Sequence, residues 1–182
     1  MSQNLHQFYT KGFQGLRPSH EQSGQKRITS AGNKKLLGYV RGLRRAQKET
    51  VRLMKTKLIS TLIVLMHSVV LVAHSKAHLQ LQIGASAWQK AFIAIVIFIG
   101  PLFAAALLWT RFQTAGIVIL ASTMAGSLVF GVAYHFFVPG SDNALELHSG
   151  HWESVFRITA TWLAVVETGA VAWCIWALKS DI

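Results

Sequence analysis

Histidines are the residues of this sequence with the clearest capacity for chemistry. Three of the eight lie in one apolar run, residues 58–79, as His67, His74 and His78. At about 100° per residue of an α-helix, their side chains fall within roughly 40° of one another. The other positions of the run are mostly Leu, Ile and Val. We therefore expect a membrane-spanning helix that turns one polar stripe toward other protein.

A metal site is the first hypothesis for these histidines. His74 and His78 are four residues apart, the spacing at which two imidazoles on a helix share one ion. Histidine and carboxylate ligands without thiolate favour copper(II), zinc or iron. The predicted ligands lie on three apolar runs and in the segment before the last one, as His74, His78, His135, His148, His151, Glu146 and Glu153. The alternative is that these histidines are ordinary polar residues at a membrane interface.

A haem b group is the second hypothesis. His74 and His135 are expected at matched depth, each about 6 Å from the same membrane boundary. Two axial imidazoles on facing helices need such a match. The small side chains of Thr123, Ser127 and Gly131 lead up to His135 at steps of four residues, so that a porphyrin could lie in the groove above them. Close packing of two helices through small residues is the alternative.

A buried polar pair is expected deeper in the membrane. Glu167 lies well inside the last apolar run, at a depth of about 21 Å from the outer end, and His67 lies at about 16 Å. If their helices touch, His67 and Glu167 could share a proton or ionise together. The alternative role is an interhelical hydrogen bond, worth about 1 kcal/mol, that holds the helices together.

The apolar runs that carry these residues predict the fold. Each is long enough for the ~20 residues that cross ~30 Å of hydrocarbon, and Gly100-Pro101 predicts a kink in the second. No segment alternates as a barrel strand would, and the connections are short. We expect an all-α integral membrane protein, a four-transmembrane-helix antiparallel bundle, with spans at residues 58–79, 87–109, 115–138 and 152–178.

The positive charge is concentrated before the first span. Residues 1–57 hold 13 of the 18 Lys and Arg but two acidic residues, which gives +11, whereas residues 58–182 sum to zero. We expect a disordered basic tail at residues 1–33 and an amphipathic juxtamembrane helix at 34–57, attracted to anionic lipid. The positive charge predicts cytoplasmic N and C termini in a multi-pass cell-membrane protein, with residues 139–151 outside. No nucleic-acid partner is expected, because the tail lacks a recognisable binding fold.

Two other interpretations of the N-terminal part remain open. Met54-Lys-Thr-Lys before an apolar run is typical of a true start, so residues 1–53 are either a cytoplasmic extension or untranslated. Ala73-His74-Ser75 is also a passable signal-peptide cleavage site. The apolar part is long for a signal peptide, which favours an anchoring helix.

These features predict a small membrane subunit that holds a transition metal or haem near the outer face. Electron transfer in a larger respiratory or oxidase assembly would suit such a site, and other membrane subunits are the expected partners. The alternative is a cofactor-free structural or accessory subunit. A transporter is less favoured, because four helices without repeats offer little machinery for alternating access. Cys174 is the single cysteine, which excludes an internal disulfide and a cysteine-built metal site.

Overall fold

The computed structural model describes residues 19–148 and 150–180, and in these ranges all regular structure is helical. The elements are α1 (Ser19–Gln80), α2 (Ala87–Phe92), the π-helix η1 (Ile93–Ile99), α3 (Gly100–Leu108), α4 (Gln113–Val132), the π-helix η2 (Ala133–Phe137) and α5 (His151–Ser180). The chain divides after Val51 into two units, and α1 contributes to both.

Four helical stretches are long and apolar enough to cross a membrane: Lys35–Gln80, Ala87–Leu108, Gln113–Phe137 and His151–Ser180. The second combines α2, η1 and α3, and the third combines α4 and η2. The last three stretches begin and end within two residues of the expected spans. The prediction of an all-helical protein with four membrane-compatible helices is confirmed.

The first unit differs from the expected tail. The part of α1 that belongs to it starts at Ser19, so residues 19–33 are helical where no regular structure was expected; residues 1–18 lie outside the described residues. Lys, Arg, Gln and Ala are good helix formers, which allows the helix to extend through this polar segment. Between residues 35 and 51 all side chains are exposed, including Leu36, Tyr39 and Leu43.

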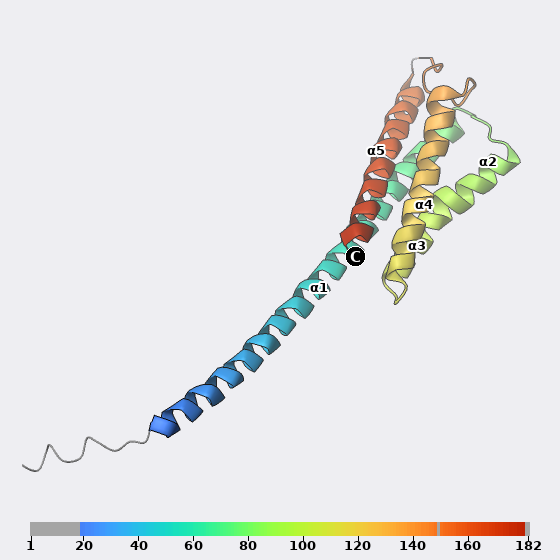
Figure 1. The fold of residues 1–182 in the computed structure, drawn as a ribbon. Helices are drawn as coiled ribbons and strands as arrows, with labels where there is room; N and C mark the ends of the chain where they lie inside the picture. The colour runs from blue at the N-terminus through green and yellow to red at the C-terminus, as the bar shows by residue number, and fades with distance from the viewer. Residues whose placement is uncertain (1–18, 149, 181–182) are drawn as a thin grey trace, which may run out of the picture. The chain divides into compact units, whose positions relative to one another are not determined.

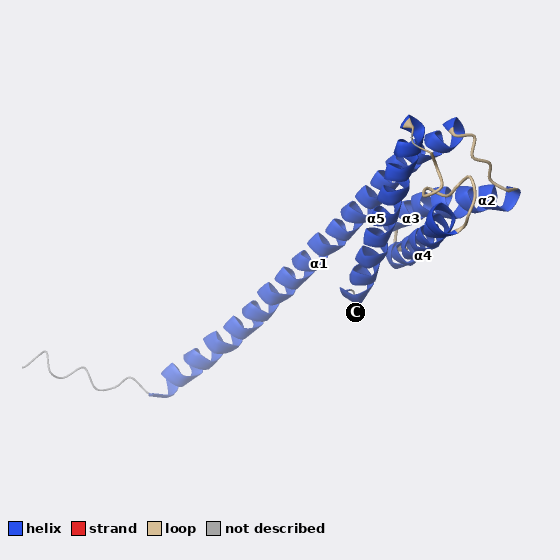
Figure 2. Cartoon of the chain, turned by 90° about the horizontal axis from the view of Figure 1, so that it is seen from above, coloured by secondary structure: helices blue, strands red, loops and turns tan. Residues whose placement is uncertain are grey.

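In the second unit, α4 packs against both α3 and α5, as Figures 1 and 2 show. One large apolar cluster fills this region, and two smaller clusters follow it toward the α5 start. The large cluster includes Val64, Leu108, Ile117, Leu120, Met124 and Cys174; the second is Leu71, Ile97 and Leu163; the third is Ala77, Ala144 and Phe156. These clusters position the polar residues that lie between them.

Two positions explain how α3 approaches α4. Pro101 has no N–H for the helical ladder, and the turn before it widens, so that the Gly100 N–H reaches Ile95 O five residues back. Gly116 lies where the two helices nearly touch. A Cβ there would be 3.0 Å from both Ala104 O and Leu108 N, so only glycine fits without a shift.

Tryptophan side chains connect α1 to its neighbours. Trp173 of α5 donates its indole N–H to Ser60 Oγ at 3.0 Å, and Trp109 donates to Thr61 Oγ1 at 3.1 Å. Meanwhile large apolar side chains such as Leu62, Val69 and Val129 point outward and are more than 60% exposed. Outward apolar and inward polar side chains are what a helix in lipid requires.

Candidate metal centre

Three histidines meet where α1 approaches its C-terminal end. His74 and His78 lie one turn apart on α1, and His135 belongs to η2. In η2 the Val138 N–H bonds to Ala133 O, five residues back, at 2.8 Å. Such wide turns change which way a side chain points and are frequent at functional sites. Here the wide turn carries His135, which is buried.

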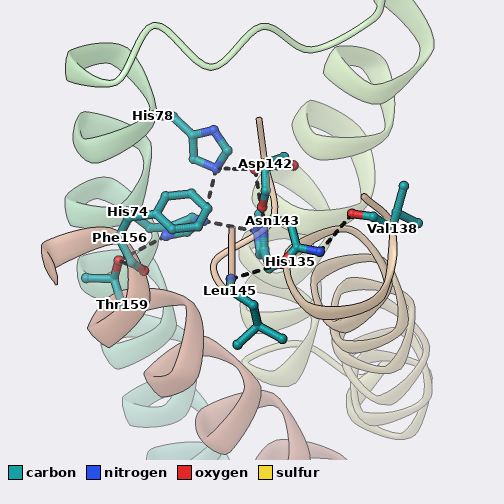
Figure 3. A network of polar contacts seen from close by, with 9 residues as sticks. All are labelled: His74, His78, His135, Val138, Asp142, Asn143, Leu145, Phe156 and Thr159. Carbon is teal, nitrogen blue, oxygen red and sulfur yellow. Dashed lines mark hydrogen bonds and ion pairs between the residues drawn. The ribbon is translucent and has the colours of Figure 1, made fainter. Parts of the chain in front are cut away.

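The three imidazoles converge through their Nε2 atoms. His74 Nε2 lies 3.1 Å from His135 Nε2 and 3.1 Å from His78 Nε2. One ligand nitrogen from each residue lies within 4.8 Å of the other two. His74 and His135 are buried and His78 is half-buried. Figure 3 shows the three rings turned toward one another beside Phe156. This group could hold a metal ion.

Thr159 is the hydrogen-bond partner of His74 Nδ1. The Thr159 hydroxyl lies 2.7 Å from Val155 O and 2.9 Å from His74 Nδ1. When the hydroxyl donates its one proton to the Val155 carbonyl, it accepts the Nδ1–H of His74. The Nε2 atom of His74 then presents its lone pair to the other two rings.

Asp142 does the same for His135. The Nδ1 atom of His135 lies 3.2 Å from the backbone oxygen of Asp142 and 3.1 Å from its Oδ1. The backbone oxygen can only accept, so the Nδ1 of His135 carries the proton. Its Nε2 lone pair then faces His74 Nε2 at 3.1 Å. This contact is a hydrogen bond when His74 Nε2 is protonated, and it suits two ligands of one cation when both Nε2 atoms present lone pairs.

Aromatic packing and charge complete the surroundings. The Phe156 ring lies against all three imidazoles, with ring centroids 4.8 to 5.1 Å apart. The Asp142 Oδ1 atom is buried, has no hydrogen bond of good geometry, and lies 3.5 Å from His78 Nε2. A negative charge beside the three rings favours a cation among them.

The segment that carries Asp142 is fixed by backbone contacts. The Ala144 N–H bonds to His135 O at 2.8 Å, and the Asn143 side chain donates to Val138 O at 3.1 Å. From α5, Arg157 donates to the backbone carbonyls of Ala144 and Leu147. Arg157 thus positions the loop over the three histidines.

The other predicted metal ligands lie outside this three-histidine group. His148 and His151 are exposed, and the His151 ring packs on Trp152 with centroids 5.2 Å apart. Glu146 accepts the Gly140 N–H at 3.1 Å, which closes a turn. Glu153 is half-buried in the first turn of α5. Among the described residues, only the set His74, His78 and His135 forms a group with metal-ligand spacing.

A haem between His74 and His135 does not fit these distances. Two axial nitrogens, each about 2 Å from one ion, lie about 4 Å apart on opposite sides of the porphyrin. The Nε2 atoms are 3.1 Å apart, which is shorter than this separation. The geometry suits ligands on adjacent corners of a small coordination sphere.

A second polar layer lies deeper along the same helices. His67 Nε2 is 3.1 Å from Glu167 Oε1, and Ser127 donates its hydroxyl to the same oxygen. All three residues are buried, with at most 3% of each exposed. The two residues expected as a buried pair are thus in contact, with Ser127 as a third member.

Sequence reasoning missed Asp142 and Thr159 as parts of the site. Thr159 precedes Glu167 by eight residues and lies on the same face of α5, a signal that periodicity contains. Asp142 gave a weaker signal, because only the folded loop brings it back to His135.

Comparisons with protein-family models, with curated proteins and with solved structures gave no match to this chain.

Proposed function

We propose that this protein is a membrane protein that binds one divalent transition-metal ion through the Nε2 atoms of His74, His78 and His135. The observation that supports the proposal most strongly is the convergence of the three imidazoles, with His74 Nε2 3.1 Å from the Nε2 atoms of both His135 and His78. Thr159 and the Asp142 backbone oxygen lie against the Nδ1 atoms of His74 and His135, where they can hold the Nδ1 protons and so free both Nε2 atoms for a cation.

The distances favour Zn²⁺ or an ion of similar geometry. At a bond length of about 2.0–2.1 Å, two nitrogen ligands of a tetrahedral zinc ion lie about 3.3 Å apart. The two 3.1 Å Nε2 separations are close to this value. Three protein ligands leave one position open, as in catalytic zinc sites and unlike closed structural sites.

The electron-transfer role expected from the sequence depends on which ion binds. Copper or iron in this site would change oxidation state, whereas zinc would not. We retain membership in a larger membrane assembly as part of the proposal. In this proposal the four helices form an antiparallel bundle with both termini in the cytoplasm and the metal near the outer face.

Metal stoichiometry tests the proposal. The full-length protein would be purified in detergent, stripped with a chelator, reloaded with Zn²⁺ and analysed for bound metal. We expect about one ion per chain. Replacing either buried ligand, in His74→Ala or His135→Ala, should reduce affinity at least a hundredfold, because two imidazoles hold zinc poorly.

Two histidines provide matched controls. His148→Ala and His151→Ala each remove an exposed imidazole at or just before the start of α5. Both variants should leave the metal content unchanged. A metal-free, folded wild-type protein would contradict the proposal and favour the cofactor-free accessory role. Loss of metal in either control would show that the replaced histidine is a metal ligand.

A further inference from the structure

A cavity of about 480 Å³ extends from the three histidines toward the deeper polar layer. Its wall is mostly apolar and comes from four helical segments, with Leu71 from α1, Ile93 and Ile97 from η1, Phe130 from α4 and Leu163 from α5. His74, His78, His135 and Asp142 line one end, and Ser127 and Glu167 line the other.

The two polar ends are separated by two helical turns on each of three helices. Seven residues separate His67 from His74, and eight separate both Ser127 from His135 and Thr159 from Glu167. At 1.5 Å per residue, the layers lie about 10–12 Å apart. The cavity is thus long enough for an apolar chain with one polar group at the histidine end.

The cavity connects directly with the proposed metal centre. All three histidine ligands line it, so the open coordination position of a bound ion is reached from the cavity. An apolar cavity of this volume favours an organic molecule over water, which would lack hydrogen-bond partners along most of the wall. The molecule that fills it would present a donor atom to the metal.

Charge indicates which donor fits. A divalent ion brings two positive charges, Asp142 brings one negative charge, and the exposed Lys90 in the cavity wall brings one more positive charge. Glu167, at the far end, is in contact with His67 and Ser127. The histidine end therefore favours an anionic oxygen donor.

We infer that the cavity binds a single-chain lipidic carboxylate, with its head group on the open position of the metal and its apolar chain against Leu71, Ile97 and Phe130. This inference rests on the proposed metal function and adds the ligand class of the same site. Carboxylate oxygen is a normal fourth ligand for zinc beside three imidazoles. A surrounding lipid phase would supply such amphiphiles, whose chains suit the apolar wall of the cavity.

Cobalt absorption tests the inference, because the visible spectrum of Co²⁺ in a zinc site changes when a ligand enters the coordination sphere. The full-length protein in a neutral detergent would be loaded with Co²⁺ and titrated with decanoate. We expect a saturable spectral change. Decanol, which has the same chain without the charge, and butyrate, which has the charge without the chain, should both bind at least tenfold more weakly.

A cavity-filling variant provides the structural control. Ile93→Trp places a large side chain in the cavity and should leave the cobalt spectrum unchanged in the absence of decanoate, while weakening decanoate binding at least tenfold. Ile95→Trp makes the same change at an outward position that is 62% exposed and should behave as the wild type.

The outcomes separate the two proposals. If Co²⁺ gives no ligand-bound spectrum at all, the metal function fails and this inference fails with it. If Co²⁺ binds but decanoate does not change its spectrum, or decanol binds as tightly as decanoate, the metal function survives and the carboxylate site is overturned. Unchanged decanoate binding in Ile93→Trp would likewise place the ligand outside this cavity.

Discussion

Thr159 shows how one hydroxyl can decide what an imidazole does. When its proton goes to the Val155 carbonyl, it accepts from His74 Nδ1 and leaves His74 Nε2 free for an ion. The backbone carbonyl of Asp142 accepts from His135 Nδ1 in the same way. At the scale of single residues, the site depends on these two acceptors as much as on the three rings.

Thr159→Val tests this dependence, since valine keeps the shape of threonine and removes the acceptor. We expect Zn²⁺ affinity to fall about 10–100-fold, the usual effect of losing a partner that orients a ligating histidine. Competition with a chromophoric chelator would measure it. Thr161→Val is the matched control, because Thr161 is exposed and bonds only to the Arg157 carbonyl. Equal affinities in the two variants would show that Thr159 does not orient His74.

Asp142→Asn tests the charge beside the histidines. The variant keeps the size of the side chain and the backbone acceptor of His135 but removes one negative charge near the ion. We expect Zn²⁺ to bind about tenfold more weakly, with Glu146→Gln, a charge change in the same loop, as the control. An unchanged affinity for Asp142→Asn would show that the carboxylate does not contribute to metal binding.

Acidification should release the ion. Protons and the metal compete for the same imidazole nitrogens, so metal affinity is greatest when all three rings are neutral and falls as the pH falls. A Zn²⁺ titration repeated at about pH 7.5 and pH 5.5 would measure the change. Equal affinity at both values would contradict this expectation and show that the ligands stay unprotonated over this interval.

Part of the candidate site could be predicted from the sequence, because helical periodicity determines which residues share a face. His74 and His78 are four residues apart on one helix, so their proximity follows from helical geometry alone. The contact of His67 with Glu167 required two helices to touch, which the sequence left as a condition, and it required the expected depths of about 21 Å and 16 Å to meet. His148 and His151 could not be separated from the true group, because the path of a connecting loop is not encoded in a simple repeat.

At the scale of elements, two π-helices are the features that periodicity could not predict. η1 precedes Pro101, for which a kink was expected, and η2 carries His135. Both replace the regular spacing of 3.6 residues by a wider turn. The four-residue steps through Thr123, Ser127 and Gly131 were expected to continue to His135. The regular helix ends at Val132, so the last regular step is at Gly131, and His135 lies in the wider turn of η2.

The contact between α3 and α4 depends on Gly116. Gly116→Leu would place a side chain where a Cβ already lies 3.0 Å from two backbone atoms. We expect the protein to lose about 1–3 kcal/mol of stability, the range for overpacking a well-packed interior. Thermal unfolding in detergent would measure it.

Gly169→Leu is the control for this change. Gly169 is an exposed helical glycine with no atom within 4 Å of an added Cβ. Leucine favours a helix more than glycine does, so Gly169→Leu should not destabilise the protein. A similar loss of stability in both variants would show that the effect does not come from the α3–α4 contact.

At the scale of the whole molecule, the prediction that remains to be tested is orientation. The excess of Lys and Arg before residue 58 favours a cytoplasmic N terminus, which would place residue 148 outside. In a Cys174→Ser background, His148→Cys should react with a membrane-impermeant maleimide on intact cells, whereas Lys48→Cys should react only after lysis. The opposite pattern would reverse the topology.

The whole account depends on a metal ion bound by three imidazoles. X-ray absorption at the zinc edge of the reloaded, detergent-purified protein tests this claim most directly. We predict a four-coordinate ion with three imidazole nitrogens at about 2.0–2.1 Å, reduced to two in His78→Ala. A spectrum without imidazole scattering, or one that His78→Ala leaves unchanged, would contradict the account.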